Sequence, residues 1–529
     1  MGKTTSIVEK IKEITLNKKK FNKEDQKVIF ASPYRQECMN MAKVESIEID
    51  GVVHPVFNGN RVKYIAKPFN FNFSSYLFSK SESKSNNSKI LQYIRRNRNI
   101  VITHEGLSRF TDEIIDLLRE YNYNLLIDEV PNVVSLKDDV AEEVSLNDFN
   151  MLKKIGVLDE NESGKISWKN PNIILEQYSK LNQSLKRGDL FYLRDSSKKP
   201  KRKIAPKGVF VHTWNSDLFI QPNSVYIYTY LFEGSYCNAY FKMKKLSWDF
   251  ENRTEKEFVY NPNIYNYDLL IKLYNPKDLK HEMFKIKKSF SKSWYDKIAK
   301  YSGLKMKEGF YEKESKSKEK DPFYPKKESE YLNDIELLVT KTNSFMKNKY
   351  LKPSEDLIQE NNFLISQMKA AGLRDDDSKI MELKEMLYEE EVVKEDRLWS
   401  TFKAFSKLLI PEKGAAYGKT QFLSYNQKAT NSFRHVKKMA YLVNVYPHPD
   451  LITFFSQRGI EIKSDQYAIS EMIQWVFRSR IRSGKKIELF IASHRMRELF
   501  KQWMQDIKRI REDRLEEINS FPTTYRDEE

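Results

Sequence analysis

The first residues of the chain, Gly2-Lys3-Thr4-Thr5, have the types and the order of the second half of a phosphate-binding loop. In the complete pattern G-x-x-x-x-G-K-[ST], backbone N–H groups surround the phosphates, the lysine reaches the β/γ-phosphates and the hydroxyl holds Mg²⁺. A second feature supports this interpretation, because the apolar run Asn124–Ile127 ends in Asp128 and Glu129. An acidic pair in that position binds Mg²⁺ and orients the attacking water in nucleotide hydrolysis.

The elements that would position these residues alternate along the first ~240 residues, a pattern that predicts a parallel α/β sheet. Several candidate strands are apolar without alternation, as strands buried on both faces should be. The candidates are 28–32, 100–103, 125–128, 209–212 and 225–229. In parallel sheets, ligands bind at the carboxyl ends of the strands, where Asp128 is expected to lie.

Three polar, low-complexity segments are predicted to be surface loops or linkers. They are 79–89, 196–203 and 311–330. The basic loop Lys198–Lys203 would contact phosphates or would simply be solvated, and solvation is the simpler interpretation.

The second half begins with a predicted helical stretch, 330–406, in which the adjacent acids Asp375, Asp376 and Asp377 read as a solvated turn or helix cap. A second α/β pattern follows, with strands predicted at 439–444 and 487–492 and helices at 467–480 and 495–519. The run 268–274 is expected to contribute a further strand to this unit.

Gln474, Arg478 and Arg482 are spaced four residues apart on the predicted helix 467–480 and its continuation, so they should share one face. Arginines there would bind developing phosphate charge, and glutamine would contact the γ-phosphate or an adenine. With apolar neighbours buried on the opposite side, Arg478 is expected to point outward and to hold no core. Arg480 points elsewhere on a helix and is expected to tolerate alanine.

These motifs together resemble the superfamily 2 DEAD/DEAH-type DNA helicases of phages and plasmids of Gram-positive bacteria. The loop Gly2-Lys3-Thr4 would be an N-terminally truncated Walker A motif, motif I. The other segments that carry the resemblance are motif Ia (Ser32-Pro33-Tyr34-Arg35), Ib (Thr103-His104-Glu105), II (Asp128-Glu129-Val130-Pro131), III (Thr229 to Ser235), V (Lys428-Ala429-Thr430-Asn431) and VI (Gln474 to Arg482).

The resemblance implies an α/β fold with two RecA-like P-loop NTPase domains, parallel sheets and a charged helical insertion. Residues 1–240 would form domain 1, 241–410 the start of domain 2 with the insertion, and 411–529 the remainder with motifs V and VI and a C-terminal helix. ATP and Mg²⁺ would bind between the domains, and hydrolysis would drive movement along nucleic acid.

The implied roles divide into three groups. ATP would be bound by Gly2, Lys3, Thr4 and Thr5, and Mg²⁺ by Thr4 and Asp128. Catalysis would use Glu129 to activate water, with Gln474, Arg478 and Arg482 acting from the second domain. Contact with nucleic acid, or its coupling to ATP, would involve Ser32, Arg35, Thr103, His104, Thr229, Thr430 and Asn431.

The chain departs from the helicase pattern at three points. The loop lacks its upstream strand and glycines, motif II reads D-E-V-P, and the second arginine of motif VI stands at i+8. Either Met1 is an internal methionine of a longer chain or the gene is a remnant. The sequence as given is expected to hydrolyse ATP weakly or not at all, whereas a chain extended upstream would be active.

The composition favours an anionic partner but does not prove one. Among 529 residues, 91 Lys and Arg against 74 Asp and Glu give a net charge of +17, which a nucleic-acid partner or an AT-rich genome would each explain. The two cysteines argue against a disulfide framework or a zinc cluster. The absence of an apolar run of ~18 residues or of a signal segment predicts a protein of the bacterial host cytoplasm with no membrane contact.

Three functions stay open from the sequence. The first is an ATP-dependent helicase or translocase for phage or plasmid replication, acting on single-stranded or duplex DNA, with RNA and replication proteins as further partners. The second is another P-loop motor such as a terminase-like ATPase, although no acidic nuclease cluster follows residue 410. The third is a non-catalytic nucleic-acid-binding remnant.

Overall fold

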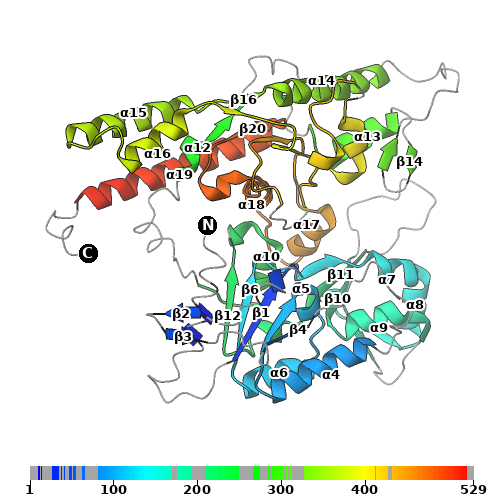
Figure 1. The fold of residues 1–529 in the computed structure, drawn as a ribbon. Helices are drawn as coiled ribbons and strands as arrows, with labels where there is room; N and C mark the ends of the chain where they lie inside the picture. Colours follow the sequence, from blue (N-terminus) through cyan, green and yellow to red (C-terminus); the bar gives the residue numbers. More distant parts are fainter. Residues whose placement is uncertain are drawn as a thin grey trace. The chain divides into compact units, whose positions relative to one another are not determined.

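The structure is a computed structural model, drawn in Figure 1 with its elements labelled. The residues that it describes are 7, 10–11, 13–14, 27–34, 37–38, 41, 47–49, 52–54, 62–65, 82–169, 176–193, 209–229, 231–249, 266–274, 284–285, 289–301, 305–307, 310–312, 327–411, 413–426 and 432–520. The chain divides into two compact units. The N-terminal unit combines Gly2–Trp248 with Pro447–Gln466, and the C-terminal unit combines Asp249–Tyr446 with Tyr467–Glu529.

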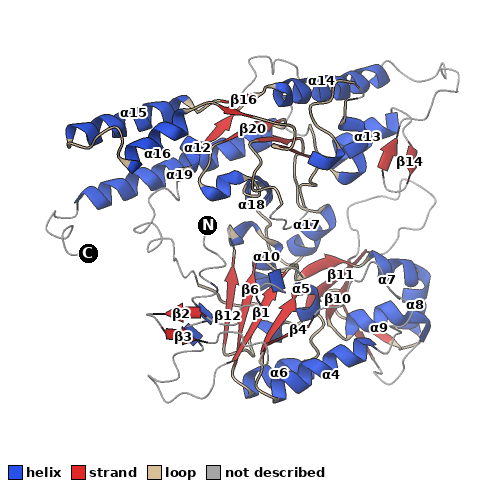
Figure 2. Cartoon of the chain, in the orientation of Figure 1, coloured by secondary structure: helices blue, strands red, loops and turns tan. Residues whose placement is uncertain are grey.

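A five-stranded parallel sheet forms the centre of the N-terminal unit, with the strand order β12-β6-β1-β5-β4 (Figure 2). Every position of β6 is buried, as expected for an apolar strand covered on both faces. The strands are β1 (Lys27–Ser32), β4 (Val62–Ile65), β5 (Asn99–Thr103), β6 (Tyr123–Asp128) and β12 (Ser224–Tyr228). Four of the five strands predicted for this half are therefore confirmed as members of one parallel sheet.

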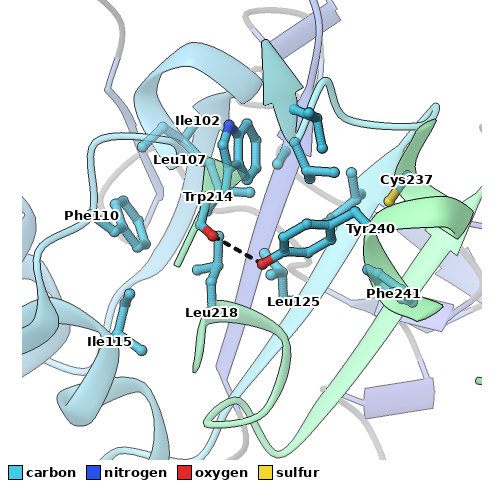
Figure 3. Packing of buried hydrophobic residues seen from close by; sticks show 14 of the residues in the cluster. Ile102, Leu107, Phe110, Ile115, Leu125, Trp214, Leu218, Cys237, Tyr240 and Phe241 are labelled. Atoms are coloured by element: carbon cyan, nitrogen blue, oxygen red, sulfur yellow. Dashed lines mark hydrogen bonds between the residues drawn. The ribbon is translucent and has the colours of Figure 1, made fainter. Parts of the chain in front are cut away.

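The two faces of this sheet bury separate apolar clusters. Figure 3 shows one, where Ile102 and Leu125 of the strands pack with Trp214 and Tyr240, and the Tyr240 hydroxyl donates to the Trp214 carbonyl at 2.9 Å. The helices that supply this cluster are α4 (Glu82–Arg95), α5 (His104–Leu107), α6 (Asp112–Glu120) and α10 (Tyr236–Met243). On the other face, the helical residues Ile7, Ile11 and Ile14 pack on Val28 and Phe30. A small hairpin, β2 (Ile47–Ile49) and β3 (Val52–His54), also belongs to this unit.

A second sheet, which is antiparallel, is inserted between β6 and β12, and the sequence did not predict it. Its order is β7-β11-β10-β9-β8. The prediction of a parallel strand at 209–212 is wrong, because β11 pairs antiparallel with β7 and β10. An apolar run indicates burial but not the direction of the neighbouring strand. The elements are β7 (Val134–Leu136), β8 (Leu158–Glu160), β9 (Lys165–Trp168), β10 (Gly188–Leu193), β11 (Val209–Trp214), α7 (Asp138–Glu143), α8 (Leu146–Lys154) and α9 (Ser179–Leu185).

The antiparallel sheet buries His212 of β11. Burial, and next the positive charge of Lys137, lowers the pKa of His212 to about 4 from its ordinary value of 6.5. The unfolded chain therefore takes up this proton at higher pH than the folded chain does. Stability from His212 is present above pH 6.5 and is lost as the pH falls toward 4, and we expect a loss of about 3 kcal/mol.

Unfolding of the wild type and His212→Gln at pH 7 and at pH 4 tests this prediction. The wild type should lose more stability than the variant between the two pH values, since glutamine does not titrate. Parallel losses in both proteins would contradict it.

A segment from the second half of the sequence, 447–466, packs in the N-terminal unit. Its helix α17 (Pro449–Ser456) places Phe454 and Phe455 in the cluster of Figure 3. The guanidinium of Arg458 lies 3.8 Å from the centroid of the Phe454 ring and 4.6 Å from that of Phe191. The sequence analysis placed this segment in the second domain, because pattern along the chain does not show which core an apolar face joins.

The C-terminal unit contains a four-stranded parallel sheet in the order β13-β20-β19-β18. Its strands are β13 (Ile271–Leu273), β18 (Arg397–Ser400), β19 (Lys438–Tyr441) and β20 (Ile487–Ile491). Its longer helices are α13 (Lys292–Tyr301), α14 (Lys327–Lys347), α15 (Glu355–Ala370), α16 (Ser378–Leu387), α18 (Ser464–Val476) and α19 (His494–Ser520). Two-stranded ribbons pair β14 (Lys305–Lys307) with β15 (Phe310–Glu312) and β16 (Tyr350–Leu351) with β17 (Glu390–Glu391).

Several local predictions for the C-terminal unit are corrected. The stretch predicted to be helical contains the strand β18, which is too short to show a period of its own. The predicted strand 268–274 begins as the helix α12 (Tyr267–Leu270). The acids at 375–377 do form a turn and cap, since Asp377 accepts from the Lys379 N–H at 2.9 Å.

The three polar segments predicted to be surface loops or linkers differ in what the structure shows of them. Residues 79–89 were predicted as a loop, but α4 begins at Glu82, and its buried anchors Ile90 and Ile94 lie after the polar stretch. The segment 196–203 and most of 311–330 lie outside the described residues. Within the part of the chain that is described, no helix combines the length and the hydropathy that a membrane-spanning segment requires.

Candidate functional site

The carboxyl edge of the parallel sheet in the N-terminal unit brings predicted site residues together. Ser32 at the end of β1 is the register partner of Thr103 at the end of β5. Asp128 at the end of β6 is the partner of Tyr228, and Thr229 follows directly. Since all these strands are parallel, Ser32, Thr103, Asp128 and Thr229 lie along one edge, as the sequence predicted.

The strand order reverses at this edge, between β1 and β6. The chain leaves β1 toward β4 on one side, and it leaves β6 toward β12 on the other side. Loops that depart in opposite directions from neighbouring strands open a crevice between them, which is the usual ligand position in such sheets. The ends of β1 and β6, and hence Ser32 and Asp128, flank this reversal.

Asp128 and Glu129 have distinct local environments. Asp128 closes the buried strand β6 and is 8% exposed. Glu129 has φ = +65°, in the left-handed region that non-glycine residues rarely adopt, and its N–H donates to the Tyr228 carbonyl at 2.9 Å. Such a conformation costs roughly 1–3 kcal/mol and is typical of functional sites. The backbone therefore turns sharply where the second acid is presented.

Glu37 joins this edge and was missed from the sequence. It accepts a hydrogen bond from the Ser32 hydroxyl at 2.7 Å. Burial first, and then the negative charges of Glu37 and Asp128, raises the pKa of Cys38 to about 12. The Cys38 thiol, which donates to the Ile102 carbonyl at 3.2 Å, is thus held protonated and is no nucleophile. The only sequence signal for Glu37 is an acid five positions after Ser32.

Thr103, which the sequence predicted to contact nucleic acid, also has a structural role. Its hydroxyl accepts from the Gly106 N–H at 3.1 Å and so caps α5, whose first residue is His104. A Cβ on Gly106 would come within 2.6 Å of the Ile102 side chain, so glycine lets α5 pack directly behind β5. His104 is partly exposed at this carboxyl edge.

The segment after Thr229 forms a turn and not a strand. Leu231 has φ = +56°, and the 3₁₀ turn η3 (Phe232–Gly234) leads to α10. Ser235 caps α10 by accepting from the Asn238 N–H at 3.1 Å. The predicted motif III therefore links β12, beside Asp128, to a helix of the main core.

The shared helix face predicted for Gln474, Arg478 and Arg482 is absent. Helix α18 ends at Val476, and Arg482 lies in the 3₁₀ turn η8 (Arg480–Ser483). Ser479 causes the break, because its hydroxyl donates to the Val476 carbonyl and accepts from the Ile481 N–H. The helical spacing used in the prediction does not apply beyond residue 476.

The two buried arginines after this helix differ in their partners. Arg480, 5% exposed, donates to both carboxylate oxygens of Glu390 at 2.5 and 2.7 Å and to the Lys486 carbonyl. Arg478 is 7% exposed, yet no described residue forms an ion pair with it, and its Nε has no acceptor. The expectation of an outward Arg478 is wrong. The buried contacts of Arg480 with Glu390 argue against its expected tolerance of alanine. Arg480 forms a buried ion pair, whereas Arg478 is a buried cation for which no described residue supplies an anion.

A further buried arginine lies at the carboxyl edge of the C-terminal sheet. Arg495, near the start of α19, donates to Asn444 Oδ1 at 3.0 Å and to the Val445 carbonyl at 2.8 Å. Asn444 in turn donates to the Ser289 carbonyl. These contacts tie the loop after β19 to α19, so we assign Arg495 a structural role.

The remaining predicted site residues lie outside the described part of the chain. They are Gly2, Lys3, Thr4, Thr5, Arg35, Thr430 and Asn431. Among the residues that are described, no three His, Cys, Asp or Glu side chains gather as a metal site.

Comparison with known proteins finds a family match in the second half of the chain. Residues 340–504 match the family model described as "YonV C-terminal Rossmann-like domain". The match spans β18, β19 and β20 with α18, in agreement with the parallel α/β sheet found there. The chain is also similar to the SPbeta prophage-derived uncharacterized protein YonV of Bacillus subtilis (strain 168). The two are 26% identical over 418 residues, which cover 78% of this chain and 82% of the relative.

Proposed function

We propose that the protein is an ATP-dependent nucleic-acid translocase or helicase with two RecA-like units. The observation that carries this proposal is the carboxyl edge of the N-terminal parallel sheet. Four strands there present Ser32, Thr103, Thr229 and the Asp128–Glu129 pair beside a switch in strand order. An acidic pair at the end of a buried parallel strand is what Mg²⁺-dependent phosphoryl transfer requires.

The acids at this edge fit a hard cation. Mg²⁺ binds through one or two carboxylates together with substrate phosphates, and Asp128 offers such a carboxylate at the carboxyl end of β6. Thr4 would complete the protein's contribution. Bound Mg²⁺–ATP supplies the phosphoryl group that is transferred. Glu129 would orient the attacking water and accept its proton, while Lys3 would neutralise phosphate charge.

Arg478 supports an anionic ligand from the C-terminal unit. A buried guanidinium without a carboxylate partner is costly unless an anion binds it. A phosphate would supply that charge, which fits the arginine role implied by the helicase resemblance. Arg482 and Gln474 would contribute from the same region.

Nucleic acid is the partner that the charge favours. The net charge of +17 would provide sequence-independent attraction to phosphates. The similar protein of Bacillus subtilis is named as prophage-derived, and we propose that the function serves phage DNA replication. DNA is the proposed substrate.

We expect Mg²⁺-dependent ATP hydrolysis that rises when single-stranded DNA is added. The measurement is phosphate release by the protein carrying any residues encoded in frame before Met1. Lys3→Ala should abolish turnover, because the charge on the β/γ-phosphates is lost. A protein that binds neither ATP nor DNA would contradict the proposed function.

A further inference from the structure

Two arginines meet where the antiparallel sheet joins the segment that follows β5. Asn215, at the end of β11, donates to Asp112 at the start of α6 at 2.7 Å and thereby fixes this junction. Gly188, the first residue of β10, pairs with the last residue of β11. Arg187 therefore lies beside the end of β11, and Arg109, between α5 and α6, is near enough for its charge to act on Arg187.

Among the described residues, the guanidinium of Arg187 has no carboxylate of its own at this junction. Arg187 is half-buried, and no described carboxylate forms an ion pair with it. Burial, and then the positive charge of Arg109, lowers the pKa of Arg187. Glu105 is the nearby acid, but it already pairs with Arg109 and is 62% exposed. Two partly desolvated guanidiniums sharing one exposed carboxylate favour the binding of a further anion.

The position of the junction indicates which anion. Arg109 follows α5, and α5 begins at Thr103 and His104, which the sequence predicted to contact nucleic acid. Guanidinium groups bind phosphate oxygens in a bidentate geometry that needs no base recognition. The junction would therefore extend the predicted contact from the parallel sheet onto the inserted antiparallel sheet.

We propose that Arg187 and Arg109 bind a backbone phosphate of single-stranded nucleic acid. The inserted sheet would then lengthen the binding surface of the N-terminal unit. This inference rests on the proposed function, since it assumes a nucleic-acid partner. The antiparallel sheet and its arginine are not part of any motif that the sequence analysis identified.

The test is a salt series of binding to a labelled oligothymidylate, read by fluorescence anisotropy with the full chain. Arg187→Gln should make the plot of log K against log salt shallower by about 0.7, the contribution of one phosphate contact to a single strand. Arg187→Lys should keep the wild-type slope because it keeps the charge. Lys186→Gln, an exposed neighbour one position away, is the matched control and should also keep it.

The outcomes separate this inference from the function on which it rests. A wild-type slope in Arg187→Gln would overturn the inference alone. A lowered melting temperature with an unchanged slope would show that Arg187 only supports the fold, and would overturn it as well. If the wild type binds the oligothymidylate without salt dependence, the nucleic-acid part of the proposed function fails too.

Discussion

Glu129→Gln is expected to lower kcat for ATP hydrolysis by about 10²–10⁴-fold, the usual contribution of a positioned general base. The amide keeps the size of the side chain but cannot accept a proton from water. Nucleotide affinity should persist, because Asp128 and the proposed phosphate-binding residues Gly2–Thr5 are untouched. The measurement is single-turnover hydrolysis beside a binding titration with a fluorescent ATP analogue.

The backbone conformation of Glu129 allows a second variant that separates activity from stability. Since φ is +65°, Glu129→Gly should remove the carboxylate without lowering the melting temperature, because glycine adopts this region freely. Activity would be lost while stability is kept or raised. The matched control is Glu120→Gln. Glu120 is an exposed acid at the end of α6, just before the amino end of β6, so this variant should behave as the wild type. Full activity in Glu129→Gln would refute the assignment of the acidic pair.

Arg478→Met and Arg480→Met are expected to have opposite effects, although the residues are two positions apart. Arg478→Met should lower kcat about 10³-fold or more, as loss of a catalytic arginine does. It should not lower the melting temperature, because replacing an unpaired buried charge with an apolar chain is often neutral or stabilising. Methionine also preserves much of the volume of the arginine stem.

Arg480→Met should destabilise the C-terminal unit by about 2–3 kcal/mol. Removal of one partner of a fully buried pair costs more, but the Glu390 side chain is 34% exposed and water screens it. Adding Glu390→Gln to Arg480→Met should recover part of the loss. Urea unfolding followed by fluorescence gives the free energies of unfolding of Arg480→Met and of the double variant. Equal destabilisation by both arginine variants, with kcat unchanged in Arg478→Met, would make Arg478 structural.

The helical spacing at 474–482 shows where sequence-based inference stopped being valid. Period 3.6 correctly predicted α18 and its buried face up to Val476. The hydroxyl of Ser479 then competes for backbone groups and starts the 3₁₀ turn η8, so the positions of Arg480 and Arg482 no longer follow that period. A single serine in a helical pattern is too common to signal such a break.

The partners of the arginines illustrate the same limit over long distance. Glu390, which pairs with Arg480, is 90 positions away in the sequence. At the candidate site, the charges of Glu37 and Asp128, which follow different strands, both act on Cys38. Similarly, the antiparallel sheet and the docking of 447–466 depend on which apolar surfaces meet. No local pattern contains that information.

The sequence by itself determined the buried strands that end in Ser32, Thr103 and Asp128, the residues on which the proposed chemistry depends. It did so because an apolar run and the polar residue that ends it are local features of the chain. Only the tertiary structure decided the strand order, the turn at Glu129 and the contrast between Arg480, paired with Glu390, and Arg478, which pairs with no described residue. These depend on burial and pairing between distant residues, and the free energy of a charged group is set by the partners that the fold brings to it.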